Sequence, residues 1–160
     1  MNRSSILLSL ILIACGTDDD GEGKDSSSGT TMPGCTEIGC VDGFNGVFSP
    51  AFTAPGAYVF TVDIDGAVST CAGNLPFDGD FACDGDLGVN LSGTALPDDE
   101  HSLPGFYLSP TEFAELQLMV ERDGVEEAAW TLSPEWSTFQ PNGPGCEPTC
   151  TSAGADLSWP

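Results

Sequence analysis

Basic side chains are scarce in this sequence of 160 residues, which has 3 Lys and Arg against 25 Asp and Glu. Proteins that grip nucleic acid by its phosphates need clustered Lys and Arg, so the charge balance excludes nucleic acid as a partner. The same negative charge repels anionic lipid headgroups. A basic partner, a divalent cation or plain solubility is compatible with it, and solubility is the ordinary explanation.

Histidine is rarer still, because His101 is the only one in the chain. A Ser–His–Asp hydrolase would need it as the general base, yet it lies in the acidic, loop-like stretch 97–102. No Gly-x-Ser-x-Gly nucleophile elbow occurs either. We therefore expect a solvated loop histidine and no enzymatic activity. A small secreted hydrolase is the third hypothesis for function.

Long apolar runs are also lacking, since the stretch at residues 6–14 (ILLSLILIA) is too short to span a bilayer. It follows Arg3 and has the length of the apolar region of an export signal. It ends in Leu12-Ile13-Ala14-Cys15, which resembles the lipobox of bacterial lipoproteins. The resemblance implies that the chain is cleaved before Cys15 and that the Cys15 thiol is diacylated, because a thiolate is the nucleophile that takes the lipid.

Three segments are predicted on this basis. Residues 1–14 are expected to be a lipoprotein signal peptide and residues 15–34 a lipidated, disordered acidic tether, because this segment has almost no apolar side chain to bury. Residues 35–160 are expected to fold. The lipid on Cys15 would hold the protein at the cell envelope. Gly16 stands where Asp retains enteric lipoproteins at the inner membrane, which favours the outer membrane or cell surface.

Two hairpins are predicted in the folded part. Asp65-Gly66 separates residues 57–64 from 67–75, and Asp123-Gly124 separates an arm ending at residue 122 from 125–133. Asp-Gly suits a two-residue turn in which both central residues have positive φ. The arm before the second turn also fits a helix that starts with a capping box at residues 109–112. Its apolar alternation favours a strand.

Further strands are expected at residues 46–49, 88–92, 105–108, 137–140 and 153–159. Seven to nine short strands separated by turn-forming residues are typical of a β-sandwich. The predicted fold is therefore all-β, an antiparallel β-sandwich of immunoglobulin-like architecture that is stapled by disulfides.

Six cysteines besides Cys15 form an even set, which in an exported domain indicates a disulfide framework. They are Cys35, Cys40, Cys71, Cys83, Cys146 and Cys150. We expect Cys71 to pair with Cys83, because Cys71 lies on the return arm of the first hairpin and Cys83 lies just before the strand expected at residues 88–92. Two arrangements stay open for the other four: each short pair closes on itself, or the first pair is stapled to the second. Their spacing does not match a zinc knuckle.

A second resemblance involves the stretch Pro141–Cys150 (PNGPGCEPTC), together with Pro55–Tyr58, Asp65-Gly66 with Cys71, and Arg122–Gly124. These phrases resemble small secreted lipoproteins that are abundant in myxobacterial-type genomes. The resemblance covers most of residues 35–160 and implies a secreted β domain behind a disordered tether. It implies no activity and no functional residue.

Clustered aspartates form a candidate metal site. Asp78, Asp80, Asp84 and Asp86 flank one cysteine in a single predicted loop, and calcium prefers carboxylates on flexible turns. The spacing is not that of an EF-hand, and Asp-Gly pairs also form turns without any ion. No cofactor is therefore expected. A calcium-dependent binding module is the second hypothesis.

Aromatic residues are candidates for a sugar-stacking platform, although burial in the sandwich core is the stronger expectation, above all for Trp130. The set is Trp130, Trp136, Trp159, Phe106 and Tyr107. The first hypothesis for function is thus a lipid-anchored cell-envelope protein. Its β-sandwich would be non-enzymatic and would be structural or adhesive, or would bind a protein or a glycan.

Overall fold

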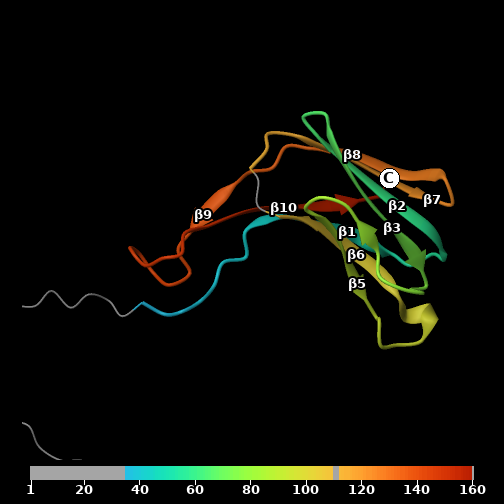
Figure 1. The fold of residues 1–160 in the computed structure, drawn as a ribbon, viewed down its shortest axis with the longest axis horizontal. Coiled ribbons are helices and arrows are strands. Elements are labelled where there is room, and N and C mark those ends of the chain that lie inside the picture. Colours follow the sequence, from blue (N-terminus) through green and yellow to red (C-terminus); the bar gives the residue numbers. More distant parts are fainter. Residues whose placement is uncertain (1–34, 110–111, 160) are drawn as a thin grey trace, which may run out of the picture. The chain divides into compact units, whose positions relative to one another are not determined.

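The computed structural model describes residues 35–109 and 112–159, in which it shows ten strands and one 3₁₀ helix (Figure 1). The helix η1 spans Asp98–Glu100. The strands are β1 (Gly43–Phe52), β2 (Gly56–Ile64), β3 (Ala67–Leu75), β4 (Ala82–Cys83), β5 (Leu87–Ser92), β6 (Ser102–Leu108), β7 (Leu116–Arg122), β8 (Val125–Leu132), β9 (Ser137–Phe139) and β10 (Cys150–Ser158). No helix of this described part is long and apolar enough to cross a membrane. The predicted signal peptide, Cys15 and the tether lie outside the described residues.

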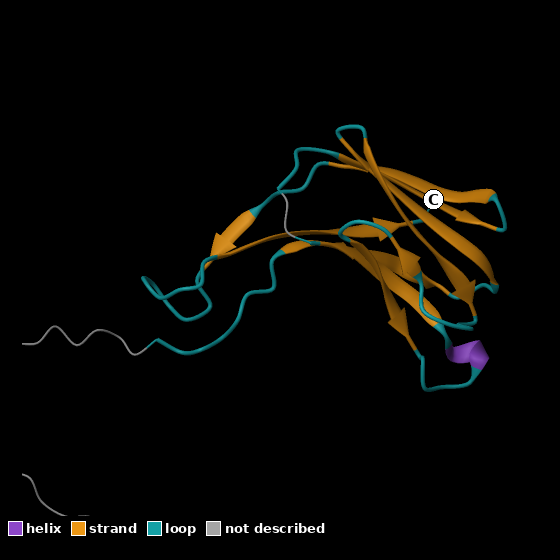
Figure 2. Ribbon diagram, in the orientation of Figure 1, coloured by secondary structure: helices purple, strands orange, loops and turns teal. Residues whose placement is uncertain are grey.

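Two five-stranded sheets face each other (Figure 2). Sheet A has the order β5-β6-β1-β10-β9, and sheet B has the order β4-β3-β2-β7-β8. Neighbouring strands are antiparallel except β1 and β10, which lie parallel inside sheet A. The predicted all-β sandwich is confirmed.

Both predicted hairpins are present. β2 and β3 pair from end to end around a turn in which Asp65 and Gly66 have φ of 53° and 83°. β7 and β8 pair around Asp123 and Gly124, with φ of 54° and 76°. Positive φ at both central residues matches the twist of the flanking strands, which explains the Asp-Gly pairs.

The ambiguous arm before the second turn is a strand, β7. Leu116, Leu118 and Val120 alternate as buried residues and point into the sandwich. A helix over the same residues would have turned one of them away from sheet A. Burial of this stripe against the facing sheet outweighs the helix-start signal at 109–112, of which residues 110 and 111 are outside the described part.

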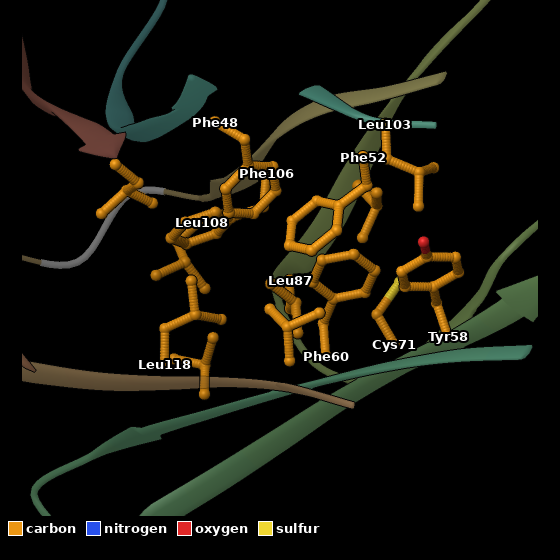
Figure 3. Close-up of a cluster of buried hydrophobic side chains, with 14 of the residues drawn as sticks. Phe48, Phe52, Tyr58, Phe60, Cys71, Leu87, Leu103, Phe106, Leu108 and Leu118 are labelled. Carbon is orange, nitrogen blue, oxygen red and sulfur yellow. The ribbon is translucent and has the colours of Figure 1, made fainter. Parts of the chain in front are cut away.

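Aromatic rings fill the space between the sheets (Figure 3). Phe48 of sheet A lies at the centre and stacks on Phe60 of sheet B at 5.9 Å and on Phe106 of its own sheet at 5.9 Å. Burying a side chain of this size contributes about 1.5–3 kcal/mol. Trp130 and Trp159 are half-buried at the margin of this core, with their rings 6.4 Å apart.

Three disulfides join the six cysteines. The expected Cys71–Cys83 bridge is present and links β3 to β4. The choice left open by the sequence is resolved as Cys35–Cys146 and Cys40–Cys150. The beginning of the described chain is thereby bonded to residues more than 100 positions later.

The bonded segments, residues 35–42 and 137–150, form what we call the staple lobe, which projects at one end of the sandwich (Figure 1). Asn142 is its hub, and it is buried. Its Oδ1 accepts from Thr36 Oγ1 and the Ile38 N–H at 2.7 and 2.8 Å, and its Nδ2 donates to the carbonyls of Ile38 and Glu147 at 3.1 and 2.7 Å. The side-chain amide of Asn142, with its oxygen and nitrogen both hydrogen-bonded, therefore connects the two segments of the lobe.

Some strands differ from their predicted limits. β1 is much longer than residues 46–49, and β10 begins at Cys150 rather than at residue 153. β1 is extended by its pairing with both β10 and β6, and the start of β10 is extended by its pairing with β9. Such non-local pairing leaves no local sequence signal. The two-residue strand β4 was not predicted, because it exists only where Cys83 is bonded beside β3.

Candidate functional site

His101 is not the solvated loop residue that the sequence predicts. It is 6% exposed, and its ring stacks on Phe77 at a centroid distance of 4.6 Å. Nδ1 accepts a hydrogen bond from the Phe77 N–H at 3.0 Å, and Nε2 donates to the Leu96 carbonyl at 3.1 Å. The prediction was wrong because the turn that contains η1 places the His101 ring against Phe77, which lies in a loop 24 residues earlier in the sequence. Both ring nitrogens are committed to backbone groups.

The four aspartates of the candidate calcium site are all exposed. Asp84 accepts hydrogen bonds from the backbone and hydroxyl of Thr70, and Asp78 accepts one from Asn74 at 2.8 Å. Among described residues, the ligand atoms of three or more metal-binding side chains come together only at Cys40, Asp42 and Cys150. The two cysteines there are bonded to each other. Calcium binding by Asp78, Asp80, Asp84 and Asp86 stays the second hypothesis, to be tested by thermal unfolding with and without calcium.

Of the five candidate stacking aromatics, only Tyr107 is an exposed residue. Phe106 is buried, and Trp130, Trp136 and Trp159 are half-buried. The indole N–H groups of these three donate to the carbonyls of Ser158, Phe113 and Pro50 respectively. The three tryptophans therefore pack against the hydrophobic core, whereas Tyr107 is 44% exposed on the outer side of sheet A.

Tyr107 lies flat across glycine. A Cβ added to Gly88, its partner on β5, would stand 2.2 Å from Tyr107 Cζ and 2.4 Å from its hydroxyl oxygen. The ring therefore occupies the space that a side chain at position 88 would need, with one face against the backbone. Its other face is left toward solvent.

Tyr107 belongs to the first of two neighbouring rows of residues that run across the strands of sheet A. The first row is Gly88, Tyr107, Asn45 and Gly154, and the second is Asn90, Gly105, Val47 and Asp156. The residues between the two rows on β6 and β5, Phe106 and Val89, are buried in the core, so the two rows lie on the outer side of sheet A. We call the eight residues the Tyr107 face.

Polar groups on the Tyr107 face are unused. The side chains of Asn45, Asn90 and Asp156 make no hydrogen bond or ion pair to any part of the chain that the structure describes. Beside Asn45 and Val47 lies a shallow hollow of about 300 Å³, lined also by Gly154, Ala155 and Asp156. The glycines of the Tyr107 face have no side chains, whereas the side chains of Asn45, Asn90 and Asp156 project from it. The face therefore combines the aromatic ring of Tyr107 with nearby hydrogen-bonding groups.

The Tyr107 face is nearly neutral within a strongly acidic domain. Asp156 is the one charged residue among its eight members, while Arg122 is the only Lys or Arg in the described part. Arg122 lies elsewhere, at the end of β7, and its guanidinium donates to the Glu127 carboxylate, with Nη2 and Oε1 2.5 Å apart. This hydrogen bond raises the pKa of Arg122. No free cation is thus available to bind an anionic ligand within residues 35–109 and 112–159.

The chain matches no protein-family model, no curated protein and no solved structure. The site is therefore defined by its own geometry. Sequence reasoning named Tyr107 but not its neighbours. Glycine at the first residue of two predicted strands, at Gly88 and Gly105, was the available signal, because glycine in a strand often marks a close approach to a backbone.

Proposed function

We propose that this chain is a lipid-anchored cell-envelope protein whose β-sandwich is non-enzymatic and binds a glycan on the Tyr107 face. The observation that carries the proposal is the ring of Tyr107, seated on Gly88 and open to solvent on its other side. One face of a pyranose ring presents C–H groups, which pack on an aromatic face. Its hydroxyl groups then point outward, toward the free amide of Asn90 on the same strand as Gly88, and the following sugars of a chain reach the free amide of Asn45.

Charge supports a glycan over other partners. Nucleic acid and anionic polysaccharides carry negative charge, which this domain repels. A protein partner usually buries about 800 Å² on each side with an apolar centre. The exposed apolar side chains of the Tyr107 face are Tyr107 and Val47 alone, which suits a small polar ligand better.

Anchoring follows from the lipobox-like sequence ending in Cys15. The staple lobe begins at Cys35, so a tether of 19 residues would separate the lipid from the folded part. A glycan-binding domain on such a tether would link the envelope to a polysaccharide outside it. This arrangement is adhesive rather than catalytic, and the commitment of both nitrogens of His101 to backbone groups supports that view.

Binding is tested by isothermal titration calorimetry with the full chain, purified from the envelope fraction in detergent. The probes are soluble tetrasaccharides of glucose, mannose, galactose and N-acetylglucosamine. We expect at least one to bind and Tyr107→Ala to weaken its binding at least tenfold, about 1.4 kcal/mol. Phe139→Ala is the matched control, because Phe139 is 46% exposed and lies in the staple lobe. Binding that survives Tyr107→Ala, or no binding of any probe, contradicts the proposal.

Anchoring is tested separately by labelling growing cells with an alkyne analogue of palmitate. The wild-type chain should take up label and sediment with membranes. Cys15→Ala should abolish both, whereas Thr17→Ala should abolish neither. Labelling that persists in Cys15→Ala would refute the lipid anchor while leaving glycan binding open.

A further inference from the structure

The hollow over β1 and β10 on the Tyr107 face has walls of three different kinds. Val47 is 48% exposed and gives it an apolar wall. Asn45 offers an amide that can donate through Nδ2, and Asp156 offers a carboxylate that only accepts. The floor is open because Gly154, the partner of Asn45 on β10, has no side chain.

These walls match the three parts of one chemical group. We propose that the Tyr107 face recognises an N-acetylhexosamine, with the acetamido group in this hollow. Its methyl packs on Val47, its carbonyl accepts from the Asn45 amide, and its N–H donates to the Asp156 carboxylate. The inference rests on the proposed glycan binding and names the class of sugar.

The dimensions of sheet A agree with this placement. Tyr107 is on β6, Asn45 is its partner on β1, and Gly154 is next on β10. Adjacent strands are about 4.8 Å apart and the ring lies over Gly88 on β5, so the ring and the far wall of the hollow on β10 are about 14 Å apart. The sugar stacked on Tyr107 and the N-acetylhexosamine whose acetamido group enters the hollow are therefore different units of one oligosaccharide that crosses β6 and β1.

The charge of the hollow narrows the class of sugar further. The hollow holds one carboxylate and no cation, so an uronic acid or a sulfated sugar would bring like charges together. A neutral acetamido group pairs its N–H with Asp156 and its carbonyl with the Asn45 amide without bringing a second charge into the hollow. A plain hydroxyl at the same carbon reaches neither Val47 nor both polar walls. Loss of such contacts commonly changes affinity by 10-fold or more.

A pair of matched ligands tests the inference. Chitotetraose and cellotetraose have the same backbone and differ at C2, where one has an acetamido group and the other a hydroxyl. With the full chain in detergent, calorimetry should show chitotetraose binding at least tenfold more tightly than cellotetraose. Affinities within twofold of each other overturn the inference.

Variants then locate the preference. Val47→Ala and Asp156→Ala should each reduce chitotetraose affinity toward that of cellotetraose and leave cellotetraose affinity unchanged. Val68→Ala is the matched control, because Val68 is 58% exposed on β3 of the other sheet and should change neither. A preference that survives both variants overturns the assignment to the hollow.

The inference and the proposed function fail in different ways. If mannose or galactose tetrasaccharides bind and chitotetraose does not, glycan binding stands and the N-acetylhexosamine inference falls. If no tetrasaccharide binds, both fall. All variants concern exposed side chains, and an unchanged thermal unfolding midpoint confirms that each is folded.

Discussion

The ring of Tyr107 occupies the space that a side chain on Gly88 would need, on the neighbouring strand of sheet A. Gly88→Ala should therefore lift the ring without removing any chemical group of the site. Only the far end of one side chain has to move, so we expect a stability loss of about 1 kcal/mol. Glycan binding should fall severalfold in calorimetry. Gly79→Ala is the control, since nothing lies within 4 Å of its added Cβ; equal effects of the two would show that Tyr107 orientation is irrelevant.

Removing His101 should destabilise the protein. His101→Ala leaves the Phe77 N–H and the Leu96 carbonyl without their partner and removes the stacked ring. An unsatisfied buried group costs about 1–3 kcal/mol, so the free energy of unfolding in urea should fall by at least that amount. Asp99→Ala, two residues earlier and exposed, should change it by less than about 0.5 kcal/mol. An unchanged free energy of unfolding in His101→Ala would mean that the His101 side chain is solvated.

The two long-range disulfides should show non-additive losses. With Cys40–Cys150 intact, opening Cys35–Cys146 by Cys35→Ser and Cys146→Ser frees only the short ring between the bridges, which costs about 3 kcal/mol. Opening both releases a loop of more than 100 residues and should cost about 7 kcal/mol. Urea unfolding measures the single variant. Near-ultraviolet circular dichroism shows whether the fourfold variant still folds, and a fourfold variant that is as stable in urea as the variant lacking one bridge would contradict this expectation.

Alkaline pH should weaken the fold through Tyr58. Its hydroxyl donates to the Ala54 carbonyl at 2.8 Å, and burial raises the pKa of Tyr58 above its ordinary value of 10.0. The unfolded chain then releases this proton at a lower pH than the folded chain, so stability is intact below about pH 10 and falls as the pH rises further. Tyr58→Phe should lose about 1 kcal/mol at pH 7 and show a smaller decline between pH 10 and 11. The two proteins losing stability in parallel there would refute the role of Tyr58.

Calcium should leave thermal stability unchanged. Asp84 already accepts two hydrogen bonds from Thr70, and the four loop aspartates do not come together as a ligand set. A ligand at 100 times its Kd would stabilise by about 2.7 kcal/mol, which scanning calorimetry detects easily. A midpoint that rises with calcium and falls again with EGTA would restore the calcium hypothesis, and Asp80→Asn with Asp86→Asn would then locate the ion.

The hairpins could be predicted because their information is local. Asp65-Gly66 specifies a turn type, and the apolar alternation on either side specifies which face is buried. The same holds for β7, where alternation outweighed a helix-start signal. Short-range patterns of this kind determine the fold class of a small β domain.

The burial of His101 and the pairing of four cysteines could not be predicted, because each depends on segments far apart in the sequence. Phe77 reaches His101 from another loop, and Cys35 meets Cys146 only once β1 and β10 lie side by side. The Tyr107 face was missed for the same reason. Its rows combine β5, β6, β1 and β10, and no alternation within one strand reveals which residues become neighbours.

The staple lobe also decides how the domain responds to mechanical pulling. A force applied before Cys35 passes through Cys35–Cys146 and Cys40–Cys150 to the start of β10 as well as to β1. Since these strands are parallel neighbours, tension enters both at the same end and does not slide one along the other. The sheet that bears the Tyr107 face should therefore keep its register under load.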